Sequence, residues 1–209
     1  VDERTRGLHH RSIAQAPFCD LTVFNTLNDR IPGDSDVHLA NSTPARYAQL
    51  FDRVRGHRWF SNRGTSGIDG CTSTAVGAAH ATGKLPTLIS GDTAFCYDSN
   101  AFWNEHLSPL LKVIVIDNGG GNIFDFLPAA NSFAEYEQQI ATPPGIDFAK
   151  VADLFGFRYI SVEGKEHFAQ AFNESLKANR SSLLEIHSNR QENLALHKTI
   201  SQEAKKSLN

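Results

Sequence analysis

Methionine is absent from the 209 residues, and the chain also lacks any long apolar run. No stretch approaches the roughly 20 apolar residues that a membrane-spanning helix needs, so we expect no stable membrane insertion. Basic residues are not in excess, because 20 Lys and Arg stand against 23 Asp and Glu and the formal net charge is −3. A nucleic-acid partner is therefore not expected, since its phosphates require clustered positive charge.

Cysteine is scarce and scattered. Cys19, Cys71 and Cys96 are odd in number and show no Cys-x-x-Cys spacing, which predicts reduced thiols, packed as small apolar residues, in a cytoplasmic protein. The opening "VDERTRGLHHRS" has neither an initiator Met nor the apolar core of a signal peptide, as at an internal cut. We expect residues 1–17 to be a linker from a preceding domain and residues 18–209 to form one domain.

The rest of the chain alternates short apolar runs with helical patterns. Six runs predict strands, at 37–41, 58–62, 85–90, 112–117, 158–163 and 182–188, and helices are expected at 18–30, 43–54, 67–83, 146–157 and 191–208. This alternation predicts an α/β fold, with a mainly parallel six-stranded sheet in a three-layer α/β/α arrangement. In such sheets ligands bind beyond the carboxyl ends of the strands.

Two loops at that edge carry polar side chains. Gly91-Asp92 follows one predicted central strand, and "DNGGGN" (117–122) ends the next. Adjacent parallel strands bring the Asp92 carboxylate beside the Asn118 amide oxygen, and such hard ligands suit Mg²⁺, which completes its shell with phosphate oxygens and water. Backbone N–H groups after Asp92 can bind the same anion, and the glycines allow close approach. The pair predicts a metal that holds a diphosphate.

The glycines also allow other interpretations. A dinucleotide loop requires Gly-x-Gly-x-x-Gly, but Asn122, Ile123 and Phe124 follow the third glycine, and no Gly-x-x-x-x-Gly-Lys-Ser/Thr motif occurs. A plain Asp-Asn-Gly turn remains the alternative. Nearby aromatic residues are expected to pack in the core behind the site: Phe95, Phe102 and Trp103. Asp98 and Asn100 are expected to cap the helix that follows them.

Two arginines lie at the same predicted edge. Arg63 follows a strand in a Gly/Ser loop, and Arg46 lies in the first turn of a helix, where a cation opposes the helix dipole. These positions suggest an anionic partner, and a dicarboxylate would suit because guanidinium binds carboxylate in a bidentate fork. A surface salt bridge is the alternative, and on the residues alone it is favoured for Arg46.

Three segments together carry a family resemblance: "SNRGTSGIDG" (61–70), "GDTAFCYDSNAFWN" (91–104) and "NGGGNIFDFLP" (118–128). They resemble the 2-succinyl-5-enolpyruvyl-6-hydroxy-3-cyclohexene-1-carboxylate synthases, thiamine diphosphate enzymes of menaquinone biosynthesis, and the first segment is the most specific. The resemblance covers about residues 18–190 and only the last third of the family's usual length. It implies that residues 18–209 form a thiamine diphosphate-binding domain. The activity it implies is decarboxylation of 2-oxoglutarate and addition of the resulting carbanion to isochorismate, releasing CO₂.

The resemblance also implies site residues by position. Asp92 and Asn118 would bind Mg²⁺, or Mn²⁺, by side chain and Gly120 by its carbonyl, while Ile68 props the cofactor in a bent form. The implied cofactor contacts are Ile68, Asp92, Thr93, Ala94, Asn118 and Ile123. The implied substrate contacts are Ser42, Arg46, Arg63, Ile123, Phe124 and Leu127.

No catalytic residue is expected in this chain, because the resemblance places the activating glutamate on the pyrimidine-binding domain of a partner subunit. A homodimer or homotetramer is implied, and the fragment alone would be inactive. Two alternatives stay open: another thiamine diphosphate-dependent 2-oxoacid decarboxylase or carboligase, and a non-catalytic α/β module.

Overall fold

The computed structural model describes residues 11–51, 56–127 and 134–208. Its strands are β1 (Asp36–Leu39), β2 (Arg58–Ser61), β3 (Pro86–Gly91), β4 (Lys112–Asp117), β5 (Arg158–Val162) and β6 (Ser182–His187). Its α-helices are α2 (Asp20–Arg30), α3 (Thr43–Tyr47), α4 (Cys71–Thr82), α5 (Asp92–Tyr97), α6 (Phe148–Leu154), α7 (Lys165–Lys177) and α8 (Arg190–Leu208), and residues 11–15 are also helical. Shorter helical turns are η1 (Ala48–Leu50), η2 (Ser99–Phe102), η3 (Asn122–Phe126) and the π-helical η5 (Glu137–Ala141).

The six strands form one sheet in the order β2-β1-β3-β4-β6-β5, and every neighbouring pair is parallel. The predicted α/β fold is confirmed. β3, β4 and β6 are buried along nearly their whole length, which explains why they are almost continuous apolar runs rather than alternating ones. The edge strands β2 and β5 are only partly buried.

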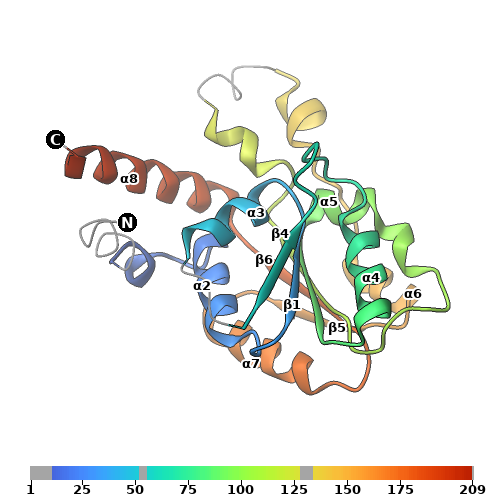
Figure 1. Ribbon diagram of the computed structural model, residues 1–209. Coiled ribbons are helices and arrows are strands. Elements are labelled where there is room, and N and C mark those ends of the chain that lie inside the picture. Colours follow the sequence, from blue (N-terminus) through green and yellow to red (C-terminus); the bar gives the residue numbers. More distant parts are fainter. Residues whose placement is uncertain (1–10, 52–55, 128–133, 209) are drawn as a thin grey trace.

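Helices cover both faces of the sheet (Figure 1). Successive residues of β4 point to opposite faces, so Ile114 and Ile116 pack with α2 and α7, whereas Val113 and Val115 pack with α4 and α6. The chain therefore has the expected three layers, with a separate apolar core on each side of the sheet.

The strand order creates a crevice between β1 and β3. After β1 the chain passes to β2 at one edge, and after β3 it passes to β4 on the other side. The connections that leave the carboxyl ends of β1 and β3 therefore run in opposite directions. This is a topological switch point, where ligands bind in open α/β sheets. The loops that begin at Ala40 and at Gly91 border this crevice.

Two expectations about the segment after β3 were wrong. Trp103 is 79% exposed, because Phe95 and Phe102 already fill the core beside Phe148 and Phe157. Asp98 does not cap the turn that follows it.

The Asp98 carboxylate instead accepts hydrogen bonds from the backbone and hydroxyl of Ser73, both at 2.6 Å, in the first turn of α4. A tertiary contact thus supplies the cap for a helix 25 residues earlier in the chain.

The expected helices occur with shifted ends. α4 ends as predicted at Gly83, whose φ of +61° is the left-handed conformation that favours glycine. α3 is much shorter than the predicted 43–54, since it gives way to η1 after Tyr47, and residues 52–55 lie outside the described residues. Within the described ranges, no helix combines the length and apolar character needed to cross a membrane.

Candidate functional site

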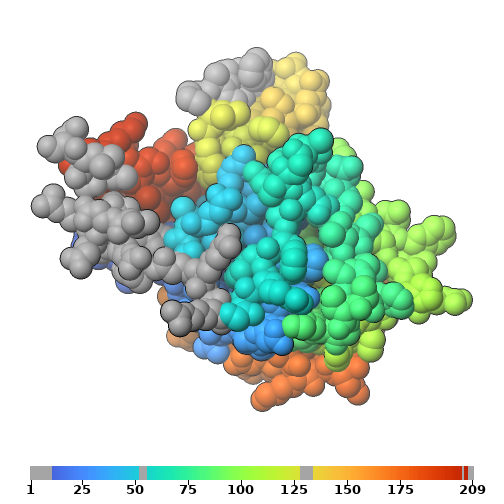
Figure 2. Space-filling model, viewed as in Figure 1, coloured from blue at the N-terminus to red at the C-terminus, as the bar shows by residue number. Residues whose placement is uncertain are grey.

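A cavity of about 280 Å³ lies at the switch point, between the loops that follow β1, β2, β3 and β4. Eight of the predicted site residues line it: Ser42, Ile68, Asp92, Thr93, Ala94, Asn118, Gly120 and Phe124. Figure 2 shows the segment containing η3 and η5 (yellow-green to yellow) beside the loop after β2 (teal) at this end of the molecule. The fold thus gathers residues from four separate sequence segments, those that follow β1, β2, β3 and β4, around one hollow.

Asp92 begins α5 directly after β3 and is only 1% exposed. Its Oδ2 accepts a hydrogen bond from the Gly120 N–H at 2.7 Å, and its Oδ1 accepts from the Thr93 N–H at 2.5 Å and the Thr93 hydroxyl at 3.1 Å. The Thr93 amide, expected to face an anion, is therefore used within the loop. Burial raises the pKa of Asp92 to about 7, with hydrogen bonds from Thr93 and Gly120 opposing this and Asp117 adding to it. A bound cation would favour the charged form.

The glycine loop is held closely against η5. The Gly121 N–H donates to the Ala141 carbonyl at 2.5 Å, and Gly120 has a φ of +109°. A Cβ at Gly120 would lie 3.0 Å from Pro143 N and closer still to the Ala141 carbonyl oxygen. Glycine is therefore required at this position for both conformation and space.

Asn118 is buried, and its side-chain amide points toward the first residue of α2. Its Nδ2 donates to Oδ2 of Asp20 at 3.1 Å, and Asp20 is fully buried. No described residue donates a hydrogen bond to Asn118 Oδ1, so this oxygen is available for a ligand.

The two predicted substrate arginines converge on the end of β1. Arg63 Nη1 donates to Asn41 Oδ1 at 2.9 Å, and Arg46 Nη1 donates to the Ser42 carbonyl at 3.0 Å. Neither guanidinium forms an ion pair with another residue in the described ranges, so the salt-bridge alternative finds no partner there. Ser42 has a φ of +75°, a strained conformation for a residue with a side chain.

Asn41 connects the loops after β1 and β2. It is fully buried, and its Nδ2 donates to the Asn62 carbonyl at 2.7 Å and to the Gly67 carbonyl at 2.6 Å. Because its Oδ1 also accepts from Arg63, one side chain fixes both the loop that carries Ile68 and the direction of the arginine.

Three predicted apolar residues lie in η3 or directly after it and are called the rim residues below. Ile123 is half-buried, Phe124 is 40% exposed and Leu127 is 57% exposed. Of these three, only Phe124 lines the 280 Å³ cavity. The predicted substrate residues Arg46 and Arg63 are also outside its lining. Arg63 instead lines a neighbouring hollow of about 380 Å³ beside Trp59 and Phe60.

A salt-bridge network of Arg190, Asp125 and Glu137, called the latch below, holds the segment that carries these rim residues. Arg190, at the start of α8, binds both oxygens of Asp125 in η3 and donates to Glu137 in η5 at 3.0 Å. The Tyr136 hydroxyl also donates to Asp125 at 2.5 Å. Burial would raise the pKa of Asp125, but the bonds from Arg190 and Tyr136 outweigh it and the pKa is lowered. The latch joins η3, η5 and α8.

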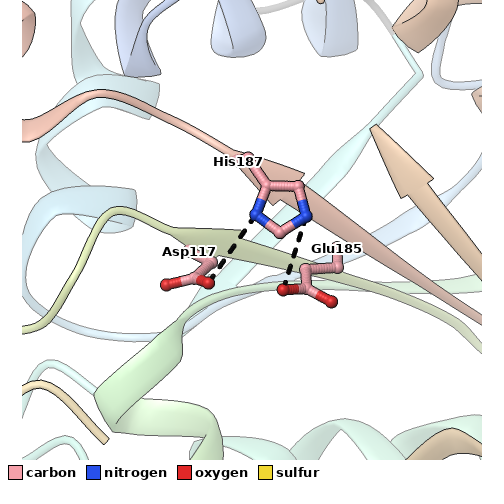
Figure 3. A group of neighbouring side chains, drawn as sticks. All are labelled: Asp117, Glu185 and His187. Carbon is pink, nitrogen blue, oxygen red and sulfur yellow. Dashed lines mark ion pairs between the residues drawn. The ribbon is translucent and has the colours of Figure 1, made fainter. Parts of the chain in front are cut away.

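A second polar cluster lies next to the cavity. Figure 3 shows the His187 ring between two carboxylates, with Nδ1 3.8 Å from Asp117 and Nε2 3.6 Å from Glu185. The Ser161 hydroxyl is 3.0 Å from Nε2, and the Tyr159 hydroxyl donates to Glu185 at 2.5 Å. One ligand atom from each of Asp117, Glu185 and His187 lies within 4.8 Å of the others, so the cluster also has the spacing of a metal centre.

The donor set at the cavity fits a magnesium ion. Asp92, Asn118 and the Gly120 carbonyl are hard oxygen donors on adjoining loops, and the Asn118 oxygen is left open by the bond that its NH₂ makes. Three residues that support the site were not singled out from the sequence: Asp20, Asn41 and Asn193. Asn41 follows β1 at the predicted edge, whereas Asp20 and Asn193 belong to no local motif and reach the site only through the fold.

Comparison with known proteins gives a consistent result. Residues 42–186 match the family described as "Thiamine pyrophosphate enzyme, C-terminal TPP binding domain". Thiamine pyrophosphate and thiamine diphosphate are the same compound.

Two curated relatives are named 2-succinyl-5-enolpyruvyl-6-hydroxy-3-cyclohexene-1-carboxylate synthase. The one from Porphyromonas gingivalis is 41% identical over 92% of this chain and 34% of its own length. The one from Christiangramia forsetii is 35% identical over 85% of this chain and 31% of its own length. The chain thus spans about a third of the length of the curated relatives it matches.

A solved structure shares the fold. The thiamine diphosphate-dependent 4-hydroxybenzoylformate decarboxylase of Rhodococcus jostii RHA1 superposes with a TM-score of 0.69 at 23% identity, covering 83% of this chain and 33% of that one. At this identity the likeness concerns the fold alone.

Proposed function

Since the chain belongs to the thiamine pyrophosphate enzymes through their C-terminal TPP binding domain, we propose that it is the diphosphate- and Mg²⁺-binding part of a synthase. The synthase decarboxylates 2-oxoglutarate and joins the remaining carbon skeleton to isochorismate, giving 2-succinyl-5-enolpyruvyl-6-hydroxy-3-cyclohexene-1-carboxylate and CO₂. The observation that carries the proposal is the convergence of Asp92, Asn118 and Gly120 on one cavity at the switch point of the sheet.

In this proposal each part of the site has a task. Asp92, Asn118 and the Gly120 carbonyl hold Mg²⁺, with Mn²⁺ as the alternative, and Thr93 and Ala94 lie against the diphosphate. Bound thiamine diphosphate supplies the electron sink for the carbon that loses CO₂. Ile68 packs against the buried cluster of Ala40, Cys71 and Ala94 and lines the cavity, which supports its assignment as the apolar prop for the cofactor.

The substrate side of the proposal rests on the arginines and the rim. Ser42, Arg46 and Arg63 bind carboxylates, because two guanidinium groups without carboxylate partners in the described ranges suit a dicarboxylate. Ile123, Phe124 and Leu127 form the apolar wall and keep water away from the reacting carbon. The exposure of Phe124 and Leu127 is consistent with a wall that another domain or the substrate completes.

The domain organisation follows from the same proposal. Residues 18–209 form the diphosphate-binding domain and residues 1–17 link it to a preceding one. The pyrimidine-binding domain of a partner subunit supplies the activating glutamate in a homodimer or homotetramer, so the present chain needs that partner for turnover.

The test uses the full-length protein with thiamine diphosphate and Mg²⁺. We expect CO₂ release to require both 2-oxoglutarate and isochorismate, and the named product to form in equal amount. CO₂ release at the same rate without isochorismate would instead indicate a 2-oxoacid decarboxylase. Failure of the full-length protein to bind the cofactor would indicate a non-catalytic module.

Arg63→Gln tests the substrate assignment. Loss of a charge-assisted bond of about 1.5–3 kcal/mol should raise the KM for a dicarboxylate substrate by roughly 10- to 150-fold. Arg30→Gln is the matched control, since Arg30 is an exposed arginine at the far end of α2. Equal KM values for the two variants would remove Arg63 from the substrate site.

A further inference from the structure

Asp20 is a fully buried carboxylate whose two oxygens have different partners. Among the described residues, Oδ2 accepts a hydrogen bond only from Asn118 Nδ2, at 3.1 Å, across 98 residues of sequence. Oδ1 accepts from the Ser188 hydroxyl at 2.5 Å and from Asn193 Nδ2 at 2.9 Å. The Asp20 N–H in turn donates to Asn193 Oδ1 at 2.9 Å. The carboxylate is therefore held firmly by α8 and the end of β6 while its second oxygen faces Asn118.

This arrangement determines which atom of Asn118 is free. Burial raises the pKa of Asp20, but the hydrogen bonds from Ser188, Asn193 and Asn118 oppose this rise and favour the carboxylate. A carboxylate only accepts hydrogen bonds, so the Asn118 amide turns its NH₂ toward Asp20. The amide oxygen is left without a donor among the described residues, on a side chain that lines the site cavity. An oxygen, unlike an NH₂ group, can coordinate Mg²⁺.

We propose that Asp20 is a positioning residue for the metal site, which orients the Asn118 amide so that its oxygen is presented to Mg²⁺. The inference rests on the proposed function, because it assigns a partner to one of the proposed metal ligands. Asp20, Ser188 and Asn193 all lie outside residues 42–186, the range that matches the family. α2 and the start of α8, which lie close together in Figure 1, thus complete a site whose ligands come from the central sheet.

Asp20→Asn is the sharpest perturbation, because it keeps the shape of the side chain while it changes one acceptor into a donor. Ser188 and Asn193 both donate to Oδ1, so the introduced amide keeps its oxygen there and turns its NH₂ toward Asn118. Two NH₂ groups then face each other. The Asn118 amide relieves this contact by rotating its oxygen toward position 20, and its NH₂ then faces the metal. We expect Mg²⁺ affinity to fall about 10- to 100-fold, as when the partner of a metal ligand is lost.

Asn118→Asp in the Asp20→Asn background should restore binding. The introduced NH₂ at position 20 donates to one carboxylate oxygen at position 118, and the other oxygen is free for Mg²⁺. Asn118→Asp by itself places two carboxylates against each other in a buried position, so it should bind Mg²⁺ more weakly than the double variant. This comparison remains decisive if Asp20→Asn alone fails to fold.

Asp36→Asn is the matched control. Asp36 is also a buried aspartate, 2% exposed, and both its oxygens accept from Arg58 at 2.7 Å. It is the first residue of β1, at the amino end of the strand, whereas the cavity lies at the carboxyl ends of the strands. The same substitution there should lower the melting temperature and leave Mg²⁺ affinity unchanged.

The measurement is calorimetric titration of Mg²⁺ into the full-length protein at fixed thiamine diphosphate, with folding checked by circular dichroism. Weak binding by Asp20→Asn with recovery in the double variant supports the proposal. Wild-type affinity in Asp20→Asn, no recovery in the double variant, or Asn118→Asp binding as tightly as the double variant overturns it. If the wild-type protein binds no Mg²⁺ with the cofactor, the proposed function fails first and takes this inference with it.

Discussion

Replacing Gly120 by alanine adds one methyl group at the tightest point of the glycine loop. The new Cβ would lie 3.0 Å from both the Ala141 carbonyl carbon and Pro143 N, with the Ala141 oxygen closer still. Gly119→Ala is a matched control, because Gly119 also has a positive φ, +82°, but apart from its two chain neighbours no heavy atom of the described residues lies within 4 Å of its added Cβ. Both variants place a side chain at a positive φ, and only Gly120→Ala adds a steric overlap.

The expected magnitudes follow from this comparison. A left-handed backbone costs a residue with a side chain about 1–2 kcal/mol, and overlap with a packed backbone adds about 1–3 kcal/mol. The free protein can relieve the overlap by moving residue 120 away from η5, which displaces its carbonyl and the N–H that bonds Asp92. Binding of Mg²⁺ must restore that position, so the overlap reappears as lost affinity.

The assay is calorimetric titration of thiamine diphosphate into each full-length variant at saturating Mg²⁺. We expect Gly120→Ala to bind roughly 5- to 150-fold more weakly than Gly119→Ala, the equivalent of about 1–3 kcal/mol. Equal affinities for the two variants would refute the reasoning, because they would show that the position of the residue 120 backbone does not matter for the cofactor.

Two further predictions concern the loops around the site. Arg190→Gln should destabilise the fold by about 3 kcal/mol at pH 7, since it leaves the mostly buried Asp125 carboxylate with the Tyr136 hydroxyl but without its cationic partner. Thermal unfolding should register this as a fall in melting temperature of roughly 6–12 °C. The lowered pKa of Asp125 gives stability that is present above about pH 4 and is lost as the pH falls further. The difference in melting temperature between Arg190→Gln and wild type should therefore shrink below pH 4. A difference that stays constant with pH would contradict the latch. Asn41→Ala should loosen the loop after β2, because it removes the amide that binds the Asn62 and Gly67 carbonyls, and trypsin should then cleave after Arg63 faster than in Ser61→Ala. Equal cleavage rates would show that Asn41 does not hold this loop.

Much of the fold was predictable because the central strands are apolar on both faces. β3, β4 and β6 stand out as short continuous runs, and the alternation with helices then determines a parallel sheet and the edge at which ligands bind. The helix ends were less predictable, as the early end of α3 shows. Trp103 was placed in the core on composition alone, although the buried phenylalanines leave it no room there.

The candidate site was predictable only where its residues follow strands. Asp92 and Asn118 come directly after β3 and β4, so their position at one edge follows from the topology. Asp20 and Asn193 belong to α2 and α8, 173 residues apart in the chain, and no local spacing announces their contact. Asp98 shows the same limit, because its partner Ser73 is supplied by tertiary packing rather than by the next helix.

The central claim is that the oxygens of Asp92, Asn118 and Gly120 bind one divalent cation together with the cofactor diphosphate. A crystal structure of the full-length protein with thiamine diphosphate and Mn²⁺, with anomalous scattering recorded for manganese, tests this directly. The account predicts one strong anomalous peak within about 2.0–2.3 Å of the Asp92 carboxylate, Asn118 Oδ1 and the Gly120 carbonyl oxygen. A peak between Asp117, Glu185 and His187 instead, with none beside Asp92, would contradict it.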